Sequence, residues 1–262
     1  MTDEEPGRSL YAPQRHDAIV DMARREGRVD VVFLSERLRI TPETVRRDLT
    51  SLERRGLVRR VHGGALPVYQ TEHEPSILQR RGRNMAEKRR IAQRALAELP
   101  AEGTVLLDSG TTTLELARAW PDDARVTVVT NSLAIAAILV DHPHAEVHFM
   151  GGRLRKLTGA AVGTWAQESL RNVVCDVAFL GTNGYTLDWG MPTPDPVEAD
   201  VKRAIVAASR RAIILADASK AGHSHFHRFA TIRDISMLIT DSSLDEETAD
   251  TLAAAGMEVA RA

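Results

Sequence analysis

The sequence of 262 residues predicts an α/β protein in two parts, a small helical N-terminal domain and a larger α/β domain with a mostly parallel sheet. Up to about residue 66, apolar residues recur at helical spacing, and from Gly103 onward short apolar runs alternate with helical stretches. Charge is also uneven, because residues 8–66 hold 13 arginines and eight acidic residues while the whole chain has a formal net charge of -2. A basic end on a near-neutral chain indicates one domain that meets a polyanion.

The composition limits the classes of protein that the chain can belong to. Its length and its 43% hydrophobic content suffice for about two domains with a sizeable core. Cys175 is the only cysteine, which excludes an intrachain disulfide and a cysteine-rich zinc site and fits a reducing compartment. The sequence has no apolar run of about 18 residues and no N-terminal signal pattern. We therefore expect a soluble cytoplasmic protein without a metal or a cofactor.

Two helices are expected before the most informative stretch of the chain. Residues 1–10 are mostly polar and are expected to be disordered. A first amphipathic helix runs from Pro13 to about Glu26 and ends at Gly27, and Asp30 can cap a second helix. Both carry apolar residues on one side, so they can pack against a third.

The third helix has clear start, period and stop signals. Thr41 is a good N-cap, and Pro42 suits the first helical position. Apolar residues at positions i, i+4 and i+7 share one buried face and are Val45, Leu49 and Leu52. Gly56, just past the last periodic turn, ends the helix.

Polar residues cover the outward side of this helix, and a short hairpin with two arginines and a glycine-rich tip follows at residues 57–64. Such a helix can read base edges in the major groove of DNA, where arginine pairs bidentately with guanine. The candidate DNA contacts are Thr41, Glu43, Thr44, Arg46, Arg47, Arg59, Arg60 and His62. A solvated basic helix is the alternative, but cap, period and hairpin together favour a winged helix-turn-helix domain over residues 11–66.

A polar linker is expected at residues 67–84 and the α/β domain at residues 85–262. Seven basic residues fall between Arg80 and Arg94 against one acid, Glu87. They either form the solvated face of a helix or contact phosphates beside the DNA site. The expected strands are 105–107, 126–129, 147–150, 177–180, 213–216 and 238–239, and the expected helices are 114–119, 133–140, 165–170, 197–209 and 246–255.

Polar or glycine-containing loops follow five of these strands, at residues 108–113, 130–132, 151–153, 181–184 and 217–220. Because ligands of open α/β sheets bind beyond the carboxyl ends of the strands, these loops predict a binding site. In the first loop, hydroxyls and backbone N–H groups at a helix start make an anion cradle.

Two groups of motifs resemble one family. The T-V-R-R-D-L core and the R-V-H-G-G-A ending between Thr41 and Ala65 resemble the DNA-binding domain of the DeoR family of bacterial transcriptional regulators. Further matches run from Glu74 to about Asp241 and comprise Glu87-Lys88 with Ile91-Ala92, LLDSGTTT, VTNS, GG, DVAFLGTNG, the Glu198-Ala199 pair and DASK. The resemblance implies a sugar-phosphate sensor whose fold is similar to ribose-5-phosphate isomerase and glucosamine-6-phosphate deaminase.

By this resemblance, the phosphate would be held by Ser109, Gly110, Thr111, Thr112, Thr113 and Lys220. The sugar hydroxyls would be held by Asp108, Asn131, Gly152, Asn183 and Glu198. A carboxylate suits the second role because it accepts hydrogen bonds from two neighbouring hydroxyls.

Two functions from different classes remain open. The first is a repressor of a sugar-catabolic operon that a phosphorylated sugar releases from double-stranded operator DNA. Such a repressor is expected to be a homodimer or a higher even homo-oligomer, because one such domain has a small footprint. The second is an aldose–ketose isomerase or sugar-phosphate deaminase with a DNA-binding domain attached.

The loop Leu180-Gly181-Thr182-Asn183 separates these functions. The isomerase pattern at this loop is D-G-A-D, so both carboxylates that proton transfer would use are missing. The sequence therefore favours a regulator that is not an enzyme. A purely architectural DNA-binding protein is hard to reconcile with the five loops.

Overall fold

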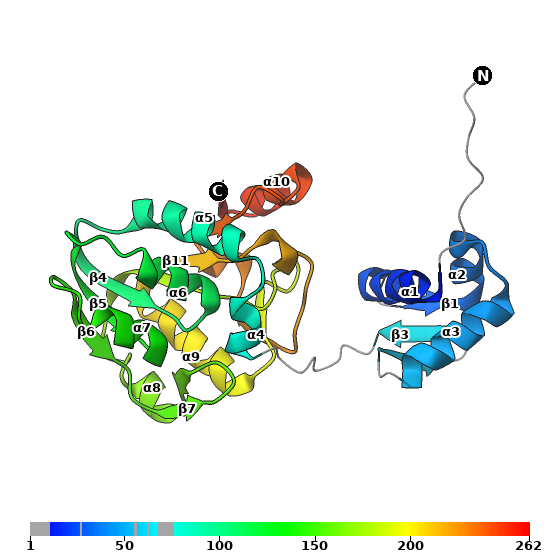
Figure 1. Ribbon diagram of the computed structural model, residues 1–262, viewed down its shortest axis with the longest axis horizontal. Coiled ribbons are helices and arrows are strands. Elements are labelled where there is room, and N and C mark those ends of the chain that lie inside the picture. The colour runs from blue at the N-terminus through cyan, green and yellow to red at the C-terminus, as the bar shows by residue number, and fades with distance from the viewer. Residues whose placement is uncertain (1–10, 27, 55–56, 62, 68–75) are drawn as a thin grey trace, which may run out of the picture. The chain divides into compact units, whose positions relative to one another are not determined.

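The computed structural model describes residues 11–262 apart from residues 27, 55–56, 62 and 68–75. The chain divides into two compact units, Met1–His73 and Glu74–Ala262 (Figure 1). Each unit has a hydrophobic core of its own. The disorder expected for the first ten residues concerns a segment outside the described residues.

The described part of the smaller unit contains three helices and a three-stranded antiparallel sheet, which is a winged helix-turn-helix arrangement. Its elements are α1 (Ala12–Glu26), β1 (Val29–Asp30), α2 (Val31–Leu38), α3 (Pro42–Arg54), β2 (Val58–Val61) and β3 (Gly64–Pro67), with the strand order β1-β3-β2. Both expected caps are present, since the N–H of Phe33 donates to Asp30 Oδ1 at 2.7 Å and the N–H of Thr44 donates to Thr41 Oγ1 at 3.2 Å. The fold class predicted for this unit is confirmed.

The sequence does not predict β1, because two residues are too short for any periodicity. Gly64 makes its pairing with β3 possible, since a Cβ at this position would lie only 2.1 Å from the carbonyl oxygen of Val29. The N–H of Val31 also donates to the carbonyl of Gly63 at 2.9 Å. The wing is thus fixed to the start of α2.

A buried carboxylate ties α1 to α3. The apolar face of α3 is fully buried and comprises Val45, Leu49 and Leu52. Asp48 of the same helix is 6% exposed and accepts hydrogen bonds from Arg15 Nε at 2.6 Å and Arg15 Nη2 at 3.1 Å. Its Oδ1 also lies 3.0 Å from His16 Nε2. Burial raises the pKa of Asp48, but the hydrogen bonds and charges of Arg15 and His16 together lower it by more. The net result is a pKa below the ordinary value.

The larger unit is built on a seven-stranded sheet with the order β14-β13-β11-β9-β4-β5-β6, in which all neighbouring strands are parallel. The sheet strands are β4 (Glu102–Leu107), β5 (Arg125–Thr130), β6 (Glu146–Phe149), β9 (Cys175–Leu180), β11 (Ser209–Leu215), β13 (Met237–Thr240) and β14 (Glu258–Arg261). Two small antiparallel pairs are added, β7 (Arg153–Arg155) with β8 (Ala160–Val162) and β10 (Met191–Thr193) with β12 (His227–Ala230).

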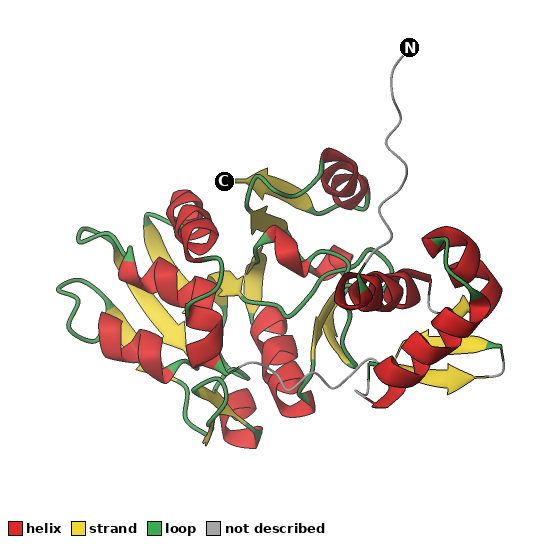
Figure 2. Cartoon of the chain, turned by 45° about the vertical axis from the view of Figure 1, so that its right-hand side comes forward, coloured by secondary structure: helices red, strands yellow, loops and turns green. Residues whose placement is uncertain are grey.

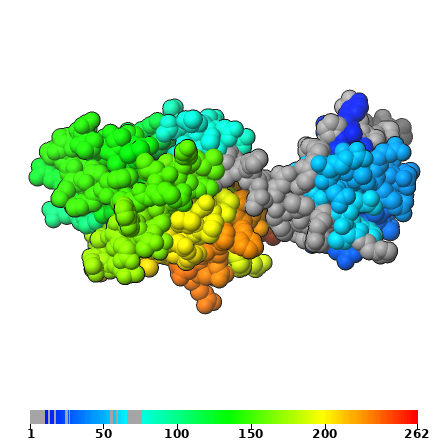
Figure 3. Space-filling model, turned by 90° about the horizontal axis from the view of Figure 1, so that it is seen from below, coloured from blue at the N-terminus to red at the C-terminus, as the bar shows by residue number. Residues whose placement is uncertain are grey.

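Helices cover both faces of this sheet (Figures 1 and 2). The helices are α4 (Ile77–Arg81), α5 (Met85–Ala95), α6 (Thr111–Arg118), α7 (Leu133–Leu139), α8 (Thr164–Glu168), α9 (Pro196–Ala207) and α10 (Glu246–Ala254), with short 3-10 turns η1 (Leu96–Glu98), η2 (Ala218–Lys220) and η3 (Ile232–Asp234). Side chains of α5, α6 and α7 pack on one face, and those of α8, α9 and α10 contribute to the cluster on the other. Figure 3 shows a yellow surface, the colour of the residues around α9, between a green and an orange surface.

The predicted α/β class and mostly parallel sheet are confirmed, and all six expected strands are present. The sequence misses β14 at one edge of the sheet. Its residues are half-buried or exposed, and it contains Glu258 and Arg261, so it has no continuous apolar run. Helix α4 lies within the stretch expected to be a linker. Within the described residues, no helix combines the length and apolarity needed to span a bilayer.

We expect Asp48→Asn to destabilise the smaller unit at neutral pH. Removing one partner of a buried ion pair costs up to about 3–5 kcal/mol, because the other charge is left uncompensated. The lowered pKa of Asp48 means that this stabilisation is complete above the ordinary value of about 3.9 and is lost as pH falls through the folded value. Amide hydrogen exchange in α1 and α3 should show a large difference from wild type at pH 7 that shrinks in acid.

The matched control is Glu43→Gln, which removes an exposed carboxylate 3.2 Å from Arg46 on the same helix. Exposed pairs contribute only about 0–1 kcal/mol. Equal protection factors for the two variants at pH 7 would show that Asp48 does not hold α1 to α3.

Candidate functional site

The outward side of α3 presents exposed cations beside the wing. Arg46 and Arg47 are both exposed, and Arg46 Nη1 lies 3.2 Å from Glu43 Oε2. From the wing, Arg60 Nη1 donates to Thr50 Oγ1 at 3.2 Å, and the N–H of Arg60 donates to Glu53 Oε1 at 2.9 Å. The structure therefore brings Arg60 onto α3. The side chain of Arg59 and the whole of His62, both candidate contacts, lie outside the described parts.

At the other candidate site, sheet order brings the predicted loops together. Strands β9, β4 and β5 are neighbours, so the loops at their carboxyl ends meet at one edge. The N–H of Ser109 donates to Asn131 Oδ1 at 2.8 Å, and the N–H of Gly181 donates to Asp108 Oδ2 at 3.3 Å. Asp108 and Asn131 are almost completely buried.

Glu198 joins this edge through a residue that the sequence did not single out. Thr158 Oγ1 donates to Glu198 Oε1 at 2.5 Å, and the carbonyl of Thr158 accepts from Ser109 Oγ at 3.2 Å. Arg155 Nη1 lies 3.4 Å from the same Glu198 oxygen, and Arg155 Nε donates to Asp195 Oδ2 at 3.0 Å. Asp195 in turn caps α9 by accepting from the N–H of Glu198 at 2.9 Å.

Lys202 is a second residue that sequence reasoning missed. It is 5% exposed, and its Nζ donates to the Asp108 carboxylate and, at 2.8 Å, to the carbonyl of Gly181. Its ammonium also lies 5.2 Å from the centre of the Phe229 ring. Lys202 lies one helical turn after Glu198, so the spacing of the two on α9 was a usable signal.

The start of α6 offers backbone donors. Thr111, Thr112 and Thr113 are buried, and no side chain caps this helix. The N-cap position is Gly110, whose backbone is extended and whose missing Cβ would lie 3.0 Å from Thr113 Oγ1. An uncapped N-terminus presents N–H groups and the positive end of the helix dipole to an anion.

Two further lysines lie at the same edge. Lys220 ends η2 and is half-buried, and Lys88 of α5 is almost completely buried. Lys88 Nζ donates to the carbonyls of Arg80 and Arg83 at 2.7 Å and 2.6 Å. Burial lowers the pKa of Lys88, Asp217 acts in the opposite direction, and Lys220 lowers it again by charge repulsion.

The remaining two candidate residues, Gly152 and Asn183, lie in loops and contact the backbone of other segments. Gly152 has a φ of +137°, and a Cβ there would lie 2.8 Å from the carbonyl of Val162, so the close approach to β8 explains this glycine. The N–H of Asn183 donates to the carbonyl of Pro192 at 3.3 Å.

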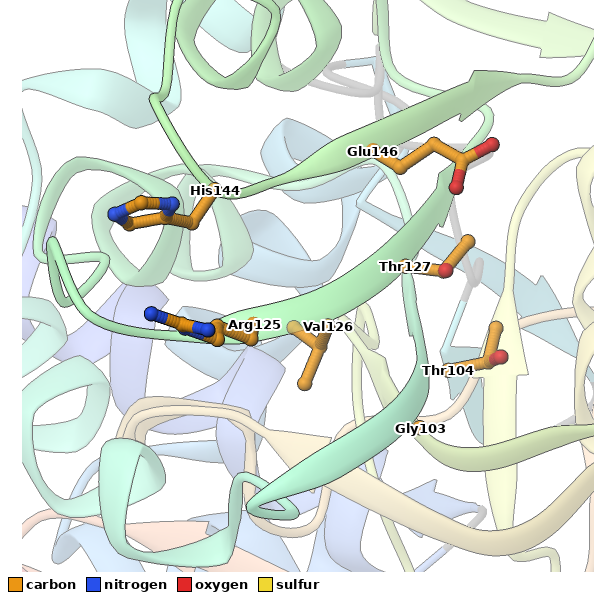
Figure 4. A pocket seen from close by; sticks show the side chains of 7 residues that line it. All are labelled: Gly103, Thr104, Arg125, Val126, Thr127, His144 and Glu146. Carbon is orange, nitrogen blue, oxygen red and sulfur yellow. The ribbon is translucent and has the colours of Figure 1, made fainter.

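A hollow of about 560 Å³ lies at the opposite end of the sheet, where β4, β5 and β6 begin (Figure 4). It is lined by Gly103, Thr104, Arg125, Val126, Thr127, His144 and Glu146, none of which is a candidate residue. Figure 4 shows their side chains spread along the strands without a common centre. A specific ligand site needs convergent polar groups, so we assign no ligand to this hollow.

The described residues contain no cluster of three or more His, Cys, Asp or Glu side chains that could hold a metal ion. Cys175 is fully buried, and burial raises the pKa of its thiol to about 11. The thiol therefore stays protonated near neutral pH and is a poor nucleophile.

Comparisons with known proteins cover most of the chain. The DeoR-like helix-turn-helix domain matches residues 15–71, and the DeoR C-terminal sensor domain matches residues 83–242. The HTH-type transcriptional regulator GlpR of Haloferax volcanii is 38% identical over 250 residues, covering 95% of this chain and 98% of that protein. The transcriptional repressor AccR of Agrobacterium fabrum is 35% identical, covering 87% and 89%. The glycerol-3-phosphate regulon repressor of Escherichia coli is 30% identical, covering 87% and 90%.

Among solved structures, ribose 5-phosphate isomerase A of Methanocaldococcus jannaschii aligns with a TM-score of 0.40 and 13% identity, covering 53% of this chain and 55% of that one. A probable sor operon regulator of Shigella flexneri aligns with a TM-score of 0.40 and 13% identity, covering 62% and 88%.

We expect Lys202→Met to destabilise the larger unit by about 3–5 kcal/mol, because Asp108 would be buried without its cation. The double variant Asp108→Asn with Lys202→Met should be more stable than Lys202→Met alone, since no charge is left unpaired. Urea unfolding followed by tryptophan fluorescence measures this unit, because Trp120, Trp165 and Trp189 all belong to it. The single variant Asp108→Asn completes the set. If the stability lost in the double variant equals the sum of the losses in the two single variants, the ion pair is not the stabilising contact.

Proposed function

We propose, because this chain belongs to the DeoR family of transcriptional regulators, that it represses a sugar-catabolic operon and leaves its operator when a phosphorylated sugar binds the larger unit. The observation that carries the proposal is the gathering of cations, hydroxyls and carboxylates at one edge of the parallel sheet. The name of one relative, the glycerol-3-phosphate regulon repressor, supports a small phosphorylated compound as the effector class.

In this proposal, the phosphate binds at the start of α6 with Lys220. Three buried threonines follow the uncapped N-terminus there, and a phosphate is largely dianionic near neutral pH. Charge-assisted hydrogen bonds from Lys220 and from backbone N–H groups then favour a phosphorylated sugar over the free sugar. Lys88 adds positive charge nearby, since its pKa is lowered in part by Lys220.

The sugar hydroxyls bind, in the same proposal, to groups whose orientation is already fixed. Asp108 is held by Lys202 and Gly181, Asn131 by the N–H of Ser109, and Glu198 by Thr158. Groups fixed before the ligand arrives lose little side-chain entropy on binding. Gly152 and Asn183 complete the set by proximity of their loops.

We infer a binding protein and not an isomerase. At the loop after β9, Leu180 is a fully buried apolar residue and Asn183 is an amide, so neither can accept a proton from a sugar carbon. Glu198 is a carboxylate at this edge, and its contacts with Thr158 and Arg155 suit a fixed hydroxyl acceptor. Absence of proton exchange at C1 and C2 of phosphosugars in deuterated water would agree with this inference.

On DNA, α3 is proposed to enter the major groove with the wing on the backbone. Thr41, Glu43, Thr44, Arg46 and Arg47 are the proposed contacts from α3, and Arg59, Arg60 and His62 those from the wing. A single unit of this size reads few base pairs, so we propose a homodimer or higher even oligomer on half-sites about 34 Å apart or a multiple of that distance.

We expect Arg46→Ala and Arg47→Ala each to weaken operator binding by about 1–3 kcal/mol and to relax sequence preference, because both guanidinium groups face outward from the first turns of α3. Arg60→Ala should instead lower the slope of log affinity against log salt by about 1. Fluorescence anisotropy across a salt series measures both, with the exposed Arg125→Ala of the larger unit as the control. If both α3 variants bind like this control, α3 is not the reading helix.

We expect Lys220→Ala to bind operator normally and to lose its response to phosphosugars. A thermal-shift panel of glycerol 3-phosphate, fructose 1-phosphate and ribose 5-phosphate with the free sugars tests the first step. A compound at about a hundred times its dissociation constant adds roughly 2.7 kcal/mol of stability. Free sugars that bind as tightly as their phosphates, or a Lys220→Ala protein that responds like Arg125→Ala, would contradict the phosphate site.

A further inference from the structure

We propose that the short helix α4 carries the effector signal toward the DNA-binding unit, because both of its ends are hydrogen-bonded to residues of the ligand edge. The inference rests on the proposed function and specifies how the site would regulate DNA binding. Helix α4 spans Ile77–Arg81 and is the first helix after residues 68–75, which connect it in sequence to β3 of the smaller unit. In the described part of the chain, α4 is therefore the helix of the larger unit that lies nearest to the wing in sequence.

The first anchor is at the start of α4. The N–H of Ile77 donates to the carbonyl of Leu157 at 2.8 Å. The next residue, Thr158, donates to Glu198 at 2.5 Å and accepts from Ser109 at 3.2 Å. A ligand that takes up Ser109 Oγ or a Glu198 oxygen competes with these bonds. The loop that holds Ile77 is thus bonded to a proposed phosphate-binding residue and to a proposed hydroxyl-binding residue.

The second anchor is at the end of α4. Lys88 Nζ donates to the carbonyl of Arg80 in the last turn and to the carbonyl of Arg83 just beyond it. The carbonyl of Arg80 also accepts from the N–H of Arg83 at 3.3 Å, so the ammonium adds a second, charged partner at this helix end. The lowered pKa of Lys88 reflects its burial and the nearby Lys220. An anion bound at Lys220 would offset that repulsion and attract the Lys88 ammonium. Because the same ammonium donates to the carbonyls of Arg80 and Arg83, a shift of Lys88 would change both hydrogen bonds.

Helix α4 is short, and it also lies against α6. It has five residues and no buried side chain, and Leu78 is 71% exposed. A capping box closes its first turn, in which the N–H of Gln79 donates to Ser76 Oγ at 3.3 Å and the N–H of Ser76 donates to Gln79 Oε1 at 2.9 Å. A helix this short is not stable on its own, so its position depends on its anchors.

These contacts give α4 the property that coupling requires. An effector can change operator affinity only if it favours one of two arrangements that differ in DNA binding. Here, one anchor of α4 is Leu157, the neighbour of Thr158, which bonds two proposed ligand groups. The other anchor is Lys88, on which the charge of Lys220 acts. Binding at the edge can therefore favour one position of α4 without any contact between the effector and α4 itself.

The test removes a hydrogen bond and leaves the helix intact. Ile77 is the first helical position, where proline is well tolerated and has no N–H to donate. Ser76 has a ψ of 155°, which suits the residue before a proline. Ile77→Pro thus deletes the bond to Leu157, whereas Ile77→Ala removes the side chain and keeps the N–H. Neither variant touches a proposed ligand or DNA contact.

Operator affinity of the full chain is measured with and without glycerol 3-phosphate, fructose 1-phosphate and ribose 5-phosphate, together with the affinity of each phosphosugar itself. We expect a phosphosugar to weaken operator binding at least tenfold in wild type and Ile77→Ala, but less than threefold in Ile77→Pro. The affinity of that phosphosugar should change less than twofold. Equal release in all three proteins would overturn the proposal, and loss of release in both variants would assign the effect to the side chain and overturn it as well.

A second measurement uses the wild-type protein alone and tests the coupling between the ligand edge and α4 even if Ile77→Pro does not fold. Inorganic phosphate is added to the wild-type protein, and amide hydrogen exchange is followed at residues 77–81. We expect their protection to change by more than threefold while α10 is unaffected, and unchanged protection would overturn the coupling by α4. The proposed function fails in a different way, when no phosphosugar of the panel binds or releases wild type.

Discussion

The ion pair between Lys202 and Asp108 is the interaction on which the ligand edge of the larger unit depends. Lys202 comes from α9, Asp108 from the end of β4, and Gly181, whose carbonyl also accepts from Lys202, from the end of β9. Removing two charges from water is costly, and the cost is offset only when both are paired and hydrogen-bonded. The pair therefore fixes the relative positions of three segments, and the loops that follow β4 and β9 inherit those positions.

Charged side chains have two separate places in the smaller unit, one buried and one exposed. Asp48 is buried and bonded to Arg15, so it fixes α3 against α1, whereas Arg46 and Arg47 on the same helix are exposed. In the larger unit, Lys202 is the buried cation that fixes the framework, and Lys220 is half-buried. In both units the cations that hold the fold are separate from the cations proposed to contact a ligand, whereas Asp108 serves both purposes in the larger unit. A cationic ligand contact can therefore be removed without breaking the buried ion pair.

Much of the candidate site could be predicted because parallel strands end at a common edge. The loops after β4, β5, β9 and β11 are expected to meet. The N–H of Ser109 donates to Asn131, and the N–H of Tyr185, just after β9, donates to the carbonyl of Lys220, so bonds join segments at that edge. The roles of Lys88, Thr158 and Lys202 could not be predicted in this way. The scarcity of lysine beside 30 arginines and the spacing of Lys202 from Glu198 are usable signals, but neither shows that a lysine is buried or names its partner.

The sequence by itself determined the helices with caps, the apolar strands and the family, because each depends on residues close together in the chain. Thr41 and Asp30 cap their helices within three residues, and the core face of α3 follows from a period of 3.6. Tertiary structure alone decided the partners of the buried charges and the anchors of α4. Lys202 and Asp108 are 94 residues apart, and the bond from Ile77 to Leu157 also joins distant parts of the sequence. Such contacts depend on strand order, which no local pattern of residues encodes.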